Sequence, residues 1–462
     1  MNLKKILKSE LFPKTIFQFL IFSTSFVLLY NFLHYTPMLG YDSYAHYTYI
    51  DFFSRYLPKD FRLPAYSDTR EYFSPPIPYI VPAFFQVLCR NIIESTDFLT
   101  ECRSFYSRYT LIFQYFLYVL TTFVNLKTLG LIFNKKSKIF TSYFLLISML
   151  SVSYRSFSMI RGEPYIVFFV SILIYLLISQ SKVGYKYKFI DVLTFGLVIG
   201  CLALSKQWAF LLFPSFFILF FYKNIDSIKE YKKFIVGSFA VGFFASSWFY
   251  IGLYLKYSTF TAFNLPSLGF NFSNKPFSFY VPSLSHFIDL FRIPIRPYLS
   301  NQFLTSLYAD TWGDYWGYFS FTSKYINIGR NQMDIGEYFA RVNLLSLFTT
   351  FIIIFFYLRF IKSNKGSVYV VYLNLSLIIT LLGYLWFVIS YPEPAGDTVK
   401  ATYILQFFYI VVLAASVELE KLRSINIYRY NIIILILFII YLHNIQTYLS
   451  HFPYQFIQDF KL

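Results

Sequence analysis

The chain has 462 residues, of which 57% are hydrophobic, 24% are aromatic and 14% are charged. Soluble domains carry about a quarter charged residues, so this composition excludes an ordinary soluble enzyme. The formal net charge is nevertheless +17, which leaves two classes, a nucleic-acid binder and a membrane protein with basic loops. The large apolar fraction favours the membrane protein, and we expect a lipid bilayer and no nucleic acid as the partner.

Apolar runs recur along the whole chain at regular intervals. A membrane-spanning helix needs roughly 20 mostly apolar residues, and we therefore expect an all-α polytopic protein in which residues 1–462 form one transmembrane domain. Eleven spans are predicted: Ile16 to His34, Tyr106 to Leu126, Ile139 to Phe157, Pro164 to Ser179, Phe189 to Ser205, Trp208 to Tyr222, Phe234 to Leu255, Val342 to Tyr357, Val368 to Tyr391, Ala401 to Val417, and Asn431 to Tyr448.

A twelfth apolar segment, Ile77 to Cys89, is short and contains Pro78 and Pro82, which suits an interfacial helix better than a span. If it does not span, the loops on the N-terminal side hold slightly more than half of the 40 Lys and Arg but fewer than a quarter of the 23 Asp and Glu. Basic loops stay in the cytoplasm, so the N-terminus is predicted to be cytoplasmic. The expected location is a bacterial inner membrane, with the endoplasmic reticulum membrane as the alternative.

Two predicted external segments are much longer than the other loops, residues 35–105 and 256–341. Function is expected where a loop is longer than topology requires. In the first segment, Asp42 begins a stretch with aromatic residues at helical spacing, which predicts an amphipathic helix on the membrane surface. His46 follows one turn later on the same face, and a carboxylate beside an imidazole can take a proton or bind a metal. The alternative is that Asp42 serves only as an N-cap.

These residues, with those that follow, resemble the GT-C glycosyltransferases. In that family an external acidic residue opens an interfacial helix, which ends near a Leu-Pro pair, and a Pro-containing second interfacial helix follows. The matching positions are Asp42, His46, Leu57-Pro58 and Pro75-Pro76-Ile77-Pro78-Tyr79. Ser43 stands where many members have a second acid, so subfamily details do not transfer.

Three later motifs occur in the family's order. Arg161-Gly162-Glu163-Pro164 resembles the second acidic motif. Ser205-Lys206 resembles the turn between two short helices in the protein O-mannosyltransferase and lipid A aminoarabinose transferase relatives. Lys400 with Tyr403 resembles a late basic motif, although Gln406 stands where Pro is common. The resemblance covers residues 1–220 well and 390–410 weakly.

The resemblance implies a GT-C-like bundle that transfers a sugar from a polyprenyl-phosphate donor to a glycan, lipid or protein acceptor on the periplasmic or luminal face. Asp42 is the candidate general base, and His46 and Tyr403 are candidate substrate-binding residues. Glu163 is expected to position the acceptor or, with Asp42 and His46, to hold a divalent metal ion. Arg161, Lys206 and Lys400 are candidates for the phosphate. The alternatives are a solvated Lys206 and basic side chains that extend to the membrane interface.

The second long segment contains the sequence Asp310-Thr311-Trp312-Gly313-Asp314-Tyr315-Trp316-Gly317. Trp312 can stack on a sugar, and Asp310 and Asp314 can accept hydrogen bonds from its hydroxyls, so these three are candidate substrate-binding residues. An aromatic belt at the membrane surface is the alternative. Cys89 and Cys102 are candidates for one external disulfide.

The rival functional class is a transporter or lipid flippase, and a third hypothesis is a non-catalytic relative that binds polyprenyl lipid. Transporters carry charged residues or Gly/Pro breaks near the middle of the membrane in repeated halves. Here the acids and bases lie mainly in the predicted loops and the spans are nearly uniformly apolar. This distribution favours the enzyme.

Overall fold

The computed structural model of the chain describes residues 6–35, 40, 42–57, 59–60, 62–92, 98–133, 140–185, 187–222, 228–261, 263, 266–320, 330–364, 367–393 and 399–450. Within these ranges the regular elements are helices and no strand occurs. The prediction of an all-α fold is therefore confirmed. Pro58, part of the predicted Leu-Pro pair, lies outside the described residues.

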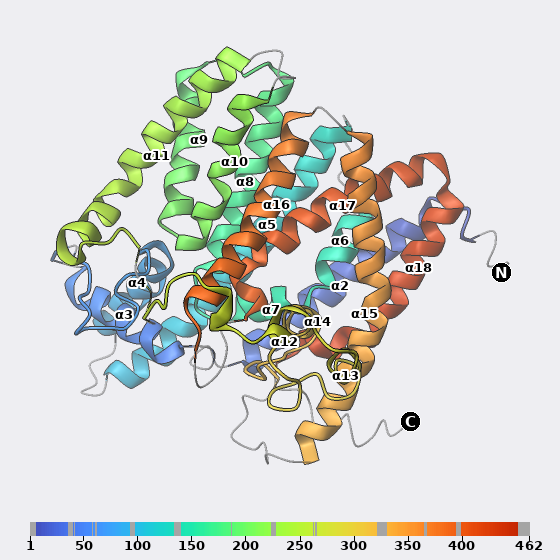
Figure 1. The fold of residues 1–462 in the computed structure, drawn as a ribbon, viewed down its shortest axis with the longest axis horizontal. Coiled ribbons are helices and arrows are strands. Elements are labelled where there is room, and N and C mark those ends of the chain that lie inside the picture. The colour runs from blue at the N-terminus through green and yellow to red at the C-terminus, as the bar shows by residue number, and fades with distance from the viewer. Residues whose placement is uncertain are drawn as a thin grey trace.

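Eight of the described helices are long and apolar enough to cross a membrane, and Figure 1 shows them side by side as one bundle. Each coincides with most of one predicted span, which supports an integral multi-pass membrane protein. The eight are α2 (Leu11–His34), α5 (Phe98–Phe133), α8 (Glu163–Lys182), α11 (Ile228–Tyr257), α15 (Arg330–Ser363), α16 (Val368–Ser390), α17 (Leu405–Ile425) and α18 (Ile427–Asn444).

The other three predicted spans correspond to shorter helices, so the count of eleven is not confirmed. The segment 139–157 is divided into α6 (Thr141–Ser148) and α7 (Ser151–Ser158), and 189–205 is the single short helix α9 (Phe189–Ala203). The segment 208–222 consists of η1 (Gln207–Leu212), α10 (Pro214–Ile218) and η2 (Leu219–Phe221). Pro214 explains the last division, because proline is accepted at the first turn of a helix but not in its interior.

The helix ends define two ends of the bundle. We call the end where α2 stops and α8 begins the site end, and the end where α2 begins and α8 stops the far end. Several of the short helices lie at the site end, in the lower part of Figure 1. They are α3 (Ser43–Tyr56), α4 (Ile77–Ile92), α7, α12 (Phe277–Tyr280), α13 (Leu284–Asp289) and α14 (Phe303–Trp312).

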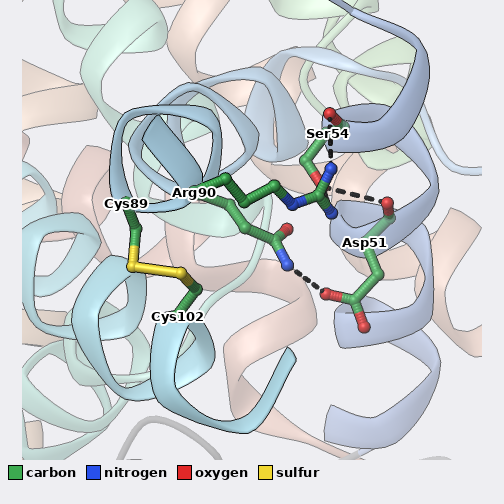
Figure 2. Close-up of a disulfide and its surroundings, with 6 residues drawn as sticks. Asp51, Ser54, Cys89, Arg90 and Cys102 are labelled. Carbon is green, nitrogen blue, oxygen red and sulfur yellow. Dashed lines mark hydrogen bonds between the residues drawn. A yellow bond between two sulfur atoms is a disulfide. The ribbon is translucent and has the colours of Figure 1, made fainter. Parts of the chain in front are cut away.

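The first long loop segment forms α3 and α4, and both are fastened to α5. Gln86 Nε2 donates to Asp51 Oδ1 at 2.7 Å, and Arg90 donates to Ser54 Oγ at 2.7 Å, which ties α4 to α3 (Figure 2). A disulfide between Cys89 and Cys102 joins α4 to α5, as anticipated for these cysteines. The 16-residue α4 is not among the helices long enough to span.

Helix α17 runs through the centre of the bundle, and most of its side chains are buried. It packs against α6, α8, α15, α16 and α18. The short helix η4 (Ala401–Ile404) directly precedes it at the site end. Because α17 is held on all sides, the residues of η4 and the preceding Lys400 are held at a defined place in the site.

Candidate active site

Two turns of the chain meet at the site end. Arg161-Gly162-Glu163 leads into α8, and Ser205-Lys206 connects α9 to η1. Gly162 permits this approach, because a Cβ atom added there would lie 2.5 Å from the Ser205 carbonyl oxygen and 3.1 Å from Lys206 Cδ. A side chain at position 162 would push the turns apart. The structure thus brings Arg161, Glu163 and Lys206 together, as their motifs predict.

Asp42 occupies the N-cap position of α3 with a left-handed backbone (φ 54°, ψ 21°), a conformation that Asp tolerates better than most residues. Its carbonyl accepts the Ala45 N–H at 3.0 Å, but its side chain makes no capping hydrogen bond. Oδ2 lies 3.6 Å from Lys400 Nζ instead, and 45% of the side chain is exposed. The backbone of Asp42 therefore starts the helix, while its carboxylate faces the Lys400 ammonium group.

The charges around Asp42 keep it ionised. Partial burial tends to raise the pKa of Asp42, but nearby positive groups outweigh burial and hold the pKa below its ordinary value; the largest contribution comes from Lys400, followed by His46, Arg161 and Lys206. Burial tends to lower the pKa of Lys400, but Tyr403 and Asp42 outweigh this effect and raise it. At neutral pH the pair is a carboxylate and an ammonium ion.

His46 is buried between α3 and α4. Its Nδ1 shares a hydrogen bond of 2.8 Å with the Tyr79 hydroxyl, and the two rings stack. Burial lowers the pKa of His46 to about 4, and the charges of Lys206 and Arg161 add to this effect, although Glu71 and Asp42 oppose it. His46 is therefore neutral at pH 7 and serves as a packing and hydrogen-bonding residue behind Asp42.

Glu71 is the acidic residue that the sequence did not single out. Its buried Oε2 lies 4.0 Å from Lys206 Nζ and accepts a hydrogen bond from Ser74. Only 14% of the Lys206 side chain is exposed. The alternative interpretation, that Lys206 is merely a solvated residue in a turn, is therefore wrong. The available signal was the position of Glu71, four residues before Pro75 at the start of the second interfacial helix.

Aromatic rings surround the Lys400 ammonium group. Nζ lies 5.3 Å from the ring centre of Tyr403 and 5.5 Å from that of Trp316, and it is 3.3 Å from the Tyr403 hydroxyl. The Arg161 guanidinium group also lies against Tyr403, 5.8 Å from the centre of the same ring. These cation–π contacts stabilise the two cations away from water, so neither side chain simply extends to the interface.

Glu163 is fully buried at the first position of α8. Arg161 Nε donates to its Oε2 at 3.2 Å, and the helix N-terminus also favours a negative charge there. Within the described chain the other oxygen, Oε1, has no hydrogen-bond partner. This oxygen is buried, and Glu163 does not line the cavity described below.

A cavity of about 50 Å³ reaches Asp42, Glu71, Lys206 and Tyr403, whereas His46, Arg161, Glu163 and Lys400 do not line it. One side is polar and the other is a wall of aromatic rings, with Trp208 stacked on Tyr403 at 5.4 Å. Such a volume holds a few water molecules, so a sugar ring enters only if wall side chains move. The lining residues are Asp42, Glu71, Phe73, Ser74, Pro75, Lys206, Gln207, Trp208, Phe263, Phe387 and Tyr403.

The structure does not bring Asp310, Trp312 and Asp314 to this cavity. Asp310 and Asp314 are buried beside Arg155 of α7, with Asp310 Oδ1 at 2.9 Å and Asp314 Oδ1 at 3.5 Å from its guanidinium nitrogens. Trp312 is buried and lines a separate apolar groove of about 490 Å³ between α14, α15, α16 and α17. None of the three candidates therefore lines the cavity, and Asp310 and Asp314 form a buried ion network with Arg155.

The candidate metal site of Asp42, His46 and Glu163 does not fit the geometry. His46 Nδ1 is engaged by Tyr79 and Glu163 Oε2 by Arg161. Across the described ranges no three His, Cys, Asp or Glu side chains are grouped so that they could hold a metal ion. We therefore derive no step through a metal.

The chain matches no protein-family model and no curated protein. Its fold is similar to a solved structure, ArnT from Cupriavidus metallidurans bound to undecaprenyl phosphate, with a TM-score of 0.46 and 10% sequence identity. The similarity covers 87% of this chain and 60% of that chain. The chain thus spans less than two thirds of the length of that protein.

Proposed function

We propose that this chain is a membrane glycosyltransferase that moves one sugar from a polyprenyl-phosphate donor to a glycan, lipid or protein acceptor. One observation carries the proposal: Asp42, Lys206 and Tyr403 line a single cavity, with Lys400 beside it, at the end of a bundle of membrane-spanning helices. A base, two cations and an aromatic wall are the groups that such a transfer requires. The order of the sequence motifs points to the same donor class.

In the proposed reaction, the acceptor hydroxyl gives its proton to the Asp42 carboxylate while its oxygen attacks the anomeric carbon of the sugar. A new bond forms between that oxygen and the anomeric carbon. The bond between the anomeric carbon and the phosphate oxygen breaks, and its electron pair stays on the polyprenyl phosphate. Attack from the opposite face inverts the configuration. The phosphate gains one negative charge, which the Lys206 and Lys400 ammonium groups stabilise.

Lys400 connects donor binding to the strength of the base. Without a donor, Lys400 faces Asp42 at 3.6 Å and its charge lowers the pKa of Asp42, which makes the carboxylate a weak base. A donor phosphate competes for the same ammonium group. When the negative phosphate lies beside Lys400, it offsets the positive charge that Asp42 experiences. The pKa of Asp42 then rises, and the carboxylate becomes a stronger base at the moment that the acceptor must lose its proton.

The aromatic wall suits the sugar. The face of a sugar ring carries C–H groups that pack on aromatic rings, and Trp208 and Tyr403 present such a stacked pair at the cavity. Across the cavity, Glu71 and Gln207 offer hydrogen-bonding groups to the sugar hydroxyls. Glu163 holds Arg161, whose guanidinium group lies against the Tyr403 ring of this wall. Asp42 and Glu163 thus have different roles, the first as base and the second in positioning.

Two observations support a periplasmic or luminal site end. The basic residues are concentrated in the loops of the far end, as expected for a cytoplasmic side. The disulfide between Cys89 and Cys102 lies at the site end, and disulfides persist in oxidising compartments outside the cytosol. The two arguments are independent, since one uses charge and the other uses cysteine chemistry.

Reconstitution with a lipid-linked sugar tests the proposal. The purified chain is placed in proteoliposomes with a polyprenyl-phosphate hexose and an acceptor extract, and the products are followed by mass spectrometry. Consumption of the donor with release of polyprenyl phosphate supports the enzyme. Movement of intact donor across the bilayer supports the flippase, and binding without consumption supports a non-catalytic lipid binder; either result rejects the proposal. Mass analysis of cell-envelope glycans in a deletion strain then identifies the sugar.

A further inference from the structure

The segment Asp310–Gly317 contacts the chain on both sides of Lys400. Trp316 Nε1 donates to the Val399 carbonyl oxygen at 2.9 Å, and the face of its ring lies 5.5 Å from Lys400 Nζ. Asp310 Oδ2 accepts the Ala401 N–H at 2.7 Å. The segment therefore binds the backbone immediately before and immediately after Lys400, and its indole ring supports the ammonium group.

Tyr384 of α16 binds the backbone of Lys400 itself through two hydrogen bonds. The Tyr384 hydroxyl accepts the Lys400 N–H at 2.6 Å and donates to the Lys400 carbonyl oxygen at 3.1 Å. In addition, Ser156 of α7 shares a hydrogen bond of 2.7 Å with Thr402 Oγ1. Four consecutive residues, 399 to 402, are thus held by side chains from α7, α14, α16 and the loop after α14.

Arg155 fixes the segment itself. Its buried guanidinium group donates to the carbonyl oxygens of Gly313 at 2.8 Å and Asp310 at 2.5 Å, and to Asp310 Oδ1 at 2.9 Å. Asp314 Oδ2 accepts the backbone N–H groups of Phe319 and Ser320 at 2.9 and 2.8 Å. The two acids of the segment are therefore engaged inside the protein by an arginine and by backbone donors.

We infer that Asp310–Gly317 is a cradle for Lys400, in which Asp310 and Trp316 act as positioning residues for the phosphate-binding cation. The consequence for transfer rests on the proposed function, but the contacts of the cradle do not. A lysine side chain is long and flexible, and a displacement of 1 Å at a reacting group can cost a factor of about 100 in rate. The cradle removes this freedom by fixing the backbone of Lys400 and one face of its ammonium group.

The cradle explains the unusual composition of the segment. Two acids are needed, one to bind Arg155 and Ala401 and one to bind the following loop. Two tryptophans face different surroundings, since Trp316 contacts Lys400 and Trp312 lines the apolar groove. Sugar binding by the same acids would require this buried network to open, at the cost of leaving Arg155 without its partners.

Chemical reactivity of Lys400 tests the cradle without any transfer assay. The purified chain is treated with trace acetic anhydride over a pH series, and peptide mass spectrometry compares acetylation of Lys400 with that of Lys421 at the far end. The variants are Trp316→Phe and Asp310→Asn. The matched control is Tyr315→Phe, which removes a neighbouring hydroxyl that donates to the Leu299 carbonyl oxygen.

We expect Lys400 in Trp316→Phe to react about threefold faster than in the wild-type chain. Phenylalanine loses the hydrogen bond to Val399 and gives a weaker cation–π contact, which lowers the pKa of Lys400 and increases the reactive neutral amine. Tyr315→Phe should leave the rate unchanged. Equal rates in Trp316→Phe and Tyr315→Phe overturn the cradle. Asp310→Asn gives a second test, read only if its melting temperature shows a folded protein. A wild-type chain without transfer activity would reject the proposed function and leave this result standing.

Discussion

The carboxylates that line the site cavity are paired differently from those at the far end of the bundle. At the far end, Glu420 accepts Ser142 Oγ at 2.6 Å and the Tyr430 hydroxyl at 2.9 Å, and Glu418 accepts Lys421 Nζ at 2.6 Å. At the site end, the pairs Asp42–Lys400 and Glu71–Lys206 are 3.6 and 4.0 Å apart.

The two groups of carboxylates differ in where their hydrogen bonds are made. Buried charges are tolerated when their hydrogen bonds are made within the protein, and at the far end these bonds join α6, α17 and α18. At the site end the wide pairs border a cavity, so the remaining hydrogen-bonding capacity of Asp42 and Glu71 faces that cavity. The comparison teaches that these pairs leave polar groups at a cavity, whereas the tight pairs at the far end hold helices together.

Replacement of the base should have the largest effect. We expect Asp42→Asn to lower kcat for transfer by about 10²- to 10⁴-fold, the range that general base catalysis contributes, without loss of folding because the side chain is half-exposed. Asp60→Asn, the same change at an exposed position of the same loop segment, is the control. Transfer by Asp42→Asn at the control rate would remove Asp42 from the mechanism.

Replacement of a lysine at the site end should cause the second largest loss of kcat. We expect Lys400→Met to lower kcat by about 10²- to 10³-fold, the cost of removing one group that stabilises a developing negative charge. Lys421→Met removes a lysine from the far end and should leave kcat within about twofold, since Lys421 lies at the opposite end of the bundle from the cavity and pairs with Glu418 there. Similar losses in both variants would contradict the distinction between the two ends.

Overpacking of the two site turns should have a smaller effect. In Gly162→Ala the added Cβ meets the Ser205 carbonyl oxygen at 2.5 Å, so the turn that holds Lys206 must shift, at a cost of about 1–3 kcal/mol. We expect a donor KM about tenfold higher in steady-state transfer assays. Gly252→Ala is the matched control, because nothing lies within 4 Å of its added Cβ. An unchanged KM in Gly162→Ala would show that the turns do not position Lys206.

The smallest expected effect is a shift in the pH dependence of kcat/KM, which tests the charges around Asp42. Asp42 must be deprotonated to act, and Lys400, His46, Arg161 and Lys206 together hold its pKa below the ordinary value. The acid limb of kcat/KM should therefore lie below pH 4, the ordinary range of an aspartate, and should move to higher pH in Lys400→Met. Because the pKa of His46 is about 4, no inflection is expected near pH 6.5. Such an inflection would contradict the buried, neutral His46.

Much of the fold is readable from the sequence, because long apolar runs specify spanning helices directly. Eight of the predicted spans correspond to such helices, and the disulfide joins the two candidate cysteines, Cys89 and Cys102. The break between α6 and α7 was not predictable. It places Arg155 against Asp310, 155 residues later in the chain, and a local apolar pattern contains no information about that partner.

The candidate site also has residues that the sequence indicates and residues that only the structure reveals. The short motifs around Asp42, Glu163, Lys206 and Lys400 indicate residues that the fold brings together, because each motif stands at the end of an apolar run. Glu71 has no such motif, and its position four residues before Pro75 is the only signal in the sequence for a role that the cavity reveals. The role of Asp310 is equally hidden in sequence, since an acid beside tryptophans is compatible with a ligand and with a buried arginine.

Direct binding of undecaprenyl phosphate tests the central claim, that the wide pairs at the site end are left apart to take a polyprenyl phosphate. The dissociation constant is measured in detergent micelles for the wild-type chain, Lys206→Met and Lys421→Met. We predict that Lys206→Met weakens binding by about 10- to 100-fold, as expected for a charged hydrogen bond of about 1.5–3 kcal/mol, and that Lys421→Met binds like the wild type. Equal affinities in the two variants would contradict the account.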